Sequence, residues 1–117
     1  MATNSQIPFS PQGPTIAITA AGSPPSGVQA SVVTSIRNSA AGQYRIVNTG
    51  NVTVHLGIGT TATLAQTNAV APTSGNPQYS VPLVAGAVEI LRFAPDSYFS
   101  GLASEETTLY ITPGEGI

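Results

Sequence analysis

The chain has 117 residues, close to the commonest length of a single domain, and 41% of them are apolar, which is enough for one modest core. Only 7% are charged, the formal net charge is −2, and all three basic residues are arginines. Three positive charges cannot neutralise many phosphates, the chain has no cysteine, and no run approaches the roughly 20 apolar residues of a membrane span. These numbers exclude nucleic-acid binding, disulfides and a transmembrane helix.

The low charge favours a folded β protein with a neutral polar surface over a disordered chain. Disorder usually accompanies high net charge and few β-branched residues, whereas Val, Ile and Thr are plentiful here. Such a surface gives a free monomer little help with solubility. A subunit of an assembly tolerates that, and the alternative is a secreted or thermally robust β domain. The first 13 residues lack the basic and apolar regions of a signal peptide, so we expect synthesis in a cytoplasm without export.

Residues 1–14 are polar and rich in proline, which fixes φ and biases the preceding residue toward extended backbone. We therefore expect an extended N-terminal arm, followed by a single β domain over residues 15–117. The arm is either a frayed terminus or a segment that docks Ile7 and Phe9 on a neighbouring subunit.

The β domain is predicted from short apolar runs separated by Gly, Pro and Asn turns. The predicted strands are residues 15–20, 28–36, two runs within 44–59, 79–83, 87–94, 98–103 and 107–112. About eight strands without a long helix predict an all-β fold, an antiparallel β-sandwich for which eight strands suit a jelly roll.

Three stretches carry more specific predictions. In residues 44–59, a polar turn at 48–51 separates two strand-like runs, which predicts a β-hairpin. Residues 60–78 lack a strand pattern and form a long loop, with a short helical turn predicted near 62–69. Because of Pro82, the strand over 79–83 is expected to lie at a sheet edge or to end there. The apolar pattern of 87–94 changes phase, which either a bulge or burial on both sides would explain.

No residue pattern indicates catalysis, a cofactor or a metal. His55, the only histidine, lies mid-strand on the polar side, which favours a solvent-facing or interface position over a catalytic one. One His and no Cys leave zinc without ligands. The run from Gly57 to Ala62 fits a loose dinucleotide loop, but no helix-rich βαβ context follows. We expect a protein that is not an enzyme.

Three segments resemble small virion structural proteins of tailed bacteriophages: residues 44–59 (YRIVNTGNVTVHLGIG), 81–93 (VPLVAGAVEILRF) and 107–116 (TTLYITPGEG). The resemblance implies a β-sandwich on the outer surface of the capsid, made in the host bacterial cytoplasm. It implies a decoration or cement protein that binds the major capsid protein and stabilises the head, acting as a homodimer or homotrimer. The alternatives are another virion component (tail, baseplate or head-fibre base) or a receptor- or carbohydrate-binding sandwich.

The candidate contact residues are chosen by position and residue type. They are apolar or aromatic side chains, the lone histidine and the long loop 60–78: Ile7, Phe9, His55, Tyr79, Tyr98 and Phe99. Each aromatic side chain either makes such a contact or belongs to the core.

Overall fold

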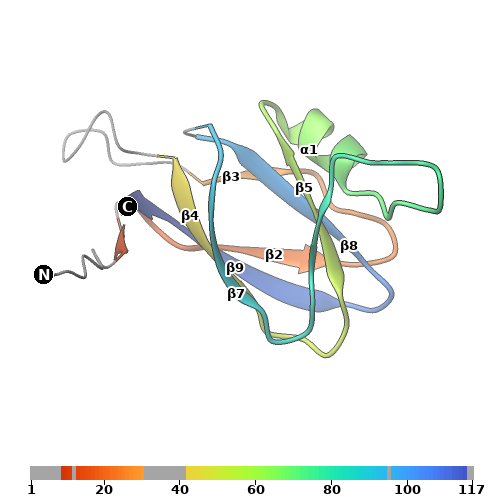
Figure 1. Ribbon diagram of the computed structural model, residues 1–117. Helices are drawn as coiled ribbons and strands as arrows, with labels where there is room; N and C mark the ends of the chain where they lie inside the picture. Colours follow the sequence, from red (N-terminus) through yellow and green to blue (C-terminus); the bar gives the residue numbers. More distant parts are fainter. Residues whose placement is uncertain (1–8, 12, 31–41, 95, 116–117) are drawn as a thin grey trace, which may run out of the picture.

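The computed structural model describes residues 9–11, 13–30, 42–94 and 96–115, which form two stacked antiparallel β-sheets with one short helix (Figure 1). The elements in chain order are β1 (Ser10–Pro11), β2 (Ile16–Ala20), β3 (Val28–Gln29), β4 (Gln43–Asn48), β5 (Val54–Gly59), α1 (Ala62–Asn68), β6 (Val81–Leu83), β7 (Val88–Arg92), β8 (Tyr98–Ala103) and β9 (Thr107–Glu115). The all-β prediction and the short helix are confirmed. Most of the predicted arm, with Ile7, lies outside the described residues, as does the strand predicted beyond residue 30.

The strand pairing is that of a jelly roll. Antiparallel pairs nest inside one another: β5 pairs with β6, β4 with β7, β3 with β8 and β2 with β9. The five-stranded sheet has the order β1-β9-β4-β7 with β2 also on β9, and the four-stranded sheet has the order β3-β8-β5-β6. The described strands thus form one long antiparallel ribbon, with β2–β5 as one arm and β6–β9 as the other, and both arms cross repeatedly from one sheet to the other.

The predicted hairpin over residues 44–59 is wrong. Both of its strands exist, but β4 lies in the five-stranded sheet and β5 in the four-stranded sheet. The polar residues between them form a corner that carries the chain across the sandwich. The residues predicted as a turn do change the direction of the chain, but they do not bring the two strands together as a pair.

Asn48 explains why the chain turns a corner there. Its side chain is buried, and its Nδ2 donates to the carbonyl oxygens of Val52 (3.0 Å), Leu83 (2.9 Å) and Val84 (3.1 Å). Its Oδ1 accepts from the Gly50 N–H at 3.0 Å. One amide therefore ties the β4–β5 corner to the β6–β7 turn, where the other arm of the ribbon crosses between the same two sheets.

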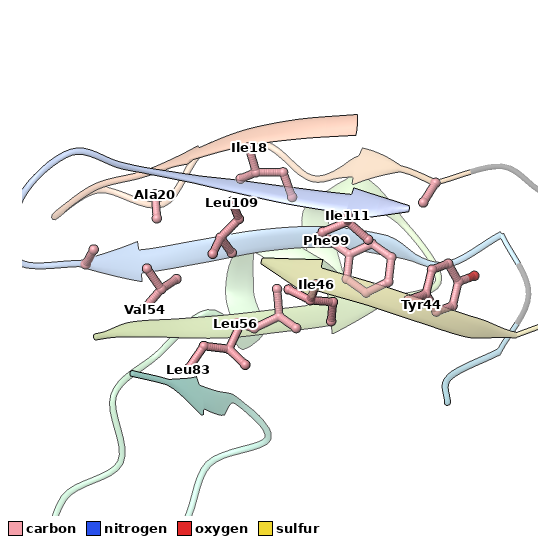
Figure 2. Close-up of a cluster of buried hydrophobic side chains, with 12 residues drawn as sticks. Ile18, Ala20, Tyr44, Ile46, Val54, Leu56, Leu83, Phe99, Leu109 and Ile111 are labelled. Atoms are coloured by element: carbon pink, nitrogen blue, oxygen red, sulfur yellow. The ribbon is translucent and has the colours of Figure 1, made fainter. Parts of the chain in front are cut away.

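The core lies between the sheets and is closed at one end by aromatic rings (Figure 2). The ring of Tyr44 packs edge-on against that of Phe99 with centroids 4.9 Å apart, and Phe93 stands 5.9 Å from Phe99. The Tyr44 hydroxyl donates to the Ala94 carbonyl at 3.0 Å. Burial raises the pKa of this hydroxyl, so it remains a neutral donor.

Helix α1 packs directly on β5 because that strand carries glycines on its outer side. A Cβ on Gly57 would lie 2.3 Å from the Ala65 carbonyl oxygen and 2.4 Å from the Ala69 nitrogen, and one on Gly59 would lie 2.6 Å from the Ala65 nitrogen. The Asn68 side chain also donates to the Ile58 carbonyl at 2.8 Å. The glycine pattern that resembles a dinucleotide loop is therefore a helix-packing site.

Strand β7 corrects a further expectation. Its register with β4 runs without interruption from Gln43↔Arg92 to Val47↔Val88, so the strand contains no bulge. Leu91 packs against the core, whereas Val88 and Ile90 are 52% and 50% exposed, so burial is one-sided. The change of phase thus marks an edge strand with apolar residues on its outer side. The prediction that the Pro82 strand is also an edge strand is confirmed for β6.

Asn48→Asp tests the corner with a side chain of the same shape. The carboxylate can accept from Gly50 but cannot donate to the Val52, Leu83 and Val84 carbonyls, of which Val84 keeps the Ala87 N–H as a donor. A buried carbonyl left unpaired costs about 1–3 kcal/mol, and the buried carboxylate adds its own desolvation cost. We expect the free energy of unfolding to fall by about 3 kcal/mol or more in denaturant titrations. Asn51→Asp, at an exposed position of the same corner, is the control and should stay within about 0.5 kcal/mol. Equal effects of the two substitutions would contradict the role of Asn48.

Gly57→Ala tests the packing of α1 on β5. The added methyl group meets helix backbone, which cannot rotate away, so we expect a loss of about 1–3 kcal/mol or more in the free energy of unfolding. Gly22→Ala is the matched control, because nothing lies within 4 Å of a Cβ there. Similar stabilities of the two variants would show that the contact is not tight.

Candidate functional site

The predicted contact residues do not share one surface. Phe99 is fully buried in the core, which corrects its assignment as a contact residue, because a ring without exposed surface cannot touch a partner. Phe9 is described just before β1 and is partly buried. Tyr79, in the segment before β6, is 86% exposed.

His55 and Tyr98 lie on the outer side of the four-stranded sheet. His55 pairs with Leu102, and Tyr98 pairs with Gly59 at the other end of the same strands. Helix α1 covers Gly57, which lies between these positions, and Gly59, which is opposite Tyr98, so the helix stands between His55 and Tyr98. Each remains a candidate contact residue on its own.

A hollow of about 460 Å³ adjoins His55. It is lined by Gly22, Thr53, Ala71, Leu102, Ala103 and Ser104 together with His55 itself. The His55 Nδ1 is shielded from solvent and has no hydrogen-bond partner among the described residues. The lining offers no carboxylate to orient the imidazole and no second metal ligand, so the hollow lacks the groups that acid–base or zinc chemistry needs. Across the described residues, no group of three or more His, Cys, Asp or Glu side chains could hold a metal ion.

The strongest surface feature is one open side of the sandwich, which we call the open side and define as residues 81–92. Strands β6 and β7 follow each other in the chain, yet each is the last strand of a different sheet. Because the two strands are joined by a short turn, both free edges lie on the same side of the sandwich. Within the described part of the chain, neither edge has a further strand on it.

Apolar side chains are exposed along the open side. Val84, in the turn between the two strands, is 64% exposed, and Val88 and Ile90 project from β7. Val47 lies beside Val88 and links it to Tyr110 on β9, another exposed large side chain. This surface was not predicted from the sequence. The apolar residues Val88 and Ile90, which alternate out of phase with Leu91, were the signal that could have indicated it.

No protein-family model, curated protein or solved structure matches this chain. Within the described residues, no helix is long and apolar enough to cross a membrane.

His55→Leu tests whether the histidine contributes to stability. The substitution removes a buried nitrogen without a partner and keeps a side chain of similar size, so the folded state loses no hydrogen bond at Nδ1. We expect the free energy of unfolding to stay equal or to rise by up to about 1 kcal/mol. A clear decrease would show that the imidazole makes an interaction that stabilises the fold.

Proposed function

We propose that this protein is a non-enzymatic structural component of a bacteriophage virion, a decoration or cement protein that binds the major capsid protein lattice from outside. The resemblance of residues 44–59, 81–93 and 107–116 to small virion proteins supports the assignment to a virion. The jelly roll is compatible with it, and among the described residues no group of three or more His, Cys, Asp or Glu side chains could hold a metal ion.

The observation that carries the proposal is a nearly uncharged surface with large side chains left exposed. Only 7% of the residues are charged, and Tyr79, Val84 and Ile90 are at least half exposed. Exposed apolar clusters on a β-sandwich are typical of surfaces that become covered in an assembly. Few charges also mean that neighbouring subunits on a lattice do not repel one another strongly.

Tyr79 is the best placed residue for contact with the capsid. It follows a loop that is held in shape by a bridge between Thr73 and Asn76 and by the Ser80 hydroxyl, which donates to the Val70 carbonyl. A preordered loop loses little conformational entropy on binding, and tyrosine is among the residues that contribute most to interfaces. Binding to the assembled shell and not to free subunits would stabilise the shell by mass action.

Cryo-electron microscopy of virions that contain this protein tests the proposal. We expect density for the jelly roll on the outer capsid lattice at repeated positions. Density at the tail or baseplate with none on the lattice would replace the decoration role by the other virion role, and absence of the protein from purified virions would overturn both. Specific binding to an oligosaccharide in a glycan array would favour a receptor-binding module instead.

Tyr79→Ser tests the proposed contact. We expect the apparent Kd for capsids lacking the protein to rise about tenfold or more, measured by co-sedimentation, because a central interface tyrosine typically contributes more than 1 kcal/mol. Ser74→Ala, an exposed position in the same loop, should leave the Kd unchanged. Unaltered binding by Tyr79→Ser would exclude this loop as the main contact without affecting the virion assignment.

A further inference from the structure

We propose that β7 is a pairing edge, through which two copies of this chain join their five-stranded sheets antiparallel across a two-fold axis. The inference does not depend on the virion assignment. It rests on the direction of the backbone groups of β7, on the absence of proline, lysine and a bulge from this strand, and on the register that two copies of the strand allow.

The hydrogen bonds to β4 show which backbone groups of β7 are free for pairing. The Asn48 N–H donates to the Ala87 carbonyl at 2.9 Å, and the Phe93 N–H donates to the Gly42 carbonyl at 2.7 Å. In an antiparallel pair, residues alternate between those that bond the neighbour and those that point away from it. Hence the odd-numbered residues bond β4, and the even-numbered ones direct their N–H and C=O groups to the open edge. These are the residues Val88, Ile90 and Arg92.

Several features that usually prevent pairing are absent from β7, although it carries the charged residues Glu89 and Arg92. Natural edge strands are protected by proline, charged side chains (lysine above all), bulges, short length, or a covering helix or loop. The other edge of the open side, β6, has three residues including Pro82. By contrast, β7 has five residues, no proline or lysine, and an uninterrupted register with β4. Of the two edges, β7 is therefore the one suited to receive a strand.

A second copy of β7 fits this edge in one favoured register. A two-fold axis must match even-numbered residues with even-numbered ones, because only these present bonding groups. Centring the axis on Ile90 places Ile90 opposite Ile90 and Val88 opposite Arg92 on both sides, which gives about six hydrogen bonds. An axis centred on Leu91 or on Glu89 would leave only about four hydrogen bonds. The axis on Glu89 would also place the two Glu89 carboxylates opposite each other.

Side chains support the same register. On the outer side of the sheet the two Ile90 side chains, half exposed in the single chain, would cover each other. Glu89 lies opposite Leu91 and Arg92 lies opposite Val88, so no like charges stand directly opposite each other. The strand is thus complementary to itself, and we infer a second copy of this chain as the occupant of the edge.

Sedimentation-velocity centrifugation of the full chain over a wide range of concentrations tests the pairing. We expect a reversible dimer, and we expect Ile90→Lys to raise its dissociation constant at least tenfold, because two lysines would oppose each other at the centre of the edge. Leu64→Lys replaces an exposed apolar residue on α1 and is the matched control, expected to dimerise normally. A circular-dichroism melt equal to that of the native chain verifies that Ile90→Lys still folds. A native chain that stays monomeric, or an Ile90→Lys chain that dimerises normally, overturns the inference.

Crosslinking tests the register. The chain has no cysteine, so Ile90→Cys introduces a single thiol. Opposed residues of a hydrogen-bonded antiparallel pair have Cα atoms about 5.5 Å apart, within the range that a disulfide spans. We expect rapid oxidation of Ile90→Cys to a covalent dimer and slow oxidation of Val84→Cys, which is exposed in the turn outside the strand. Equal rates, or faster oxidation at Val84, would contradict the register.

Discussion

The side-chain amide of Asn48 is the interaction on which the rest of the structure depends. In a jelly roll both arms of the ribbon must cross from one sheet to the other, and here two of these crossings lie side by side. The amide joins them, since it donates to Val52 in its own corner and to Leu83 and Val84 in the opposite arm. The Val84 carbonyl also accepts from the Ala87 N–H at 3.0 Å, so the amide acts mainly as a link between the two crossings. Loss of the donor to a buried carbonyl costs about 1–3 kcal/mol, an appreciable part of the stability of a domain.

The position of the crossings determines which surface of the sandwich is covered and which strand edges stay free. Once β6 and β7 diverge into different sheets, they leave two free edges on one side of the sandwich. On the outer side of the four-stranded sheet, glycines of β5 admit α1, which covers backbone that would otherwise be exposed. One surface is therefore closed by its own helix, and the other remains available for another chain. The proposed self-pairing of β7 uses the side that the fold leaves open, whereas the proposed capsid contact at Tyr79 lies in the segment just before β6.

Local patterns in the sequence predicted the strands better than their partners. The alternation of Val54 and Leu56 with His55 and Gly57 predicted β5 and its core-facing side. The choice of sheet could not be predicted locally, because two of the acceptors of Asn48, the carbonyls of Leu83 and Val84, lie 35 and 36 residues further along the chain. The glycines of β5 carried a readable signal of close backbone approach. Phe99 could not be separated from surface aromatics by residue type alone, because its burial follows from which side of β8 meets the other sheet.

Native-state hydrogen exchange, resolved by NMR, tests the central role of Asn48 most directly. The relevant protons are those of the Asn48 side-chain amide and that of the Gly50 N–H, which donates to the Asn48 Oδ1. If this amide holds the two crossings together, these protons exchange only through global unfolding, with the same free energy as backbone amides in the centre of β4 and β9. Exchange through a local opening of much lower free energy, while β4 and β9 stay protected, would show that the sandwich is held together without this corner.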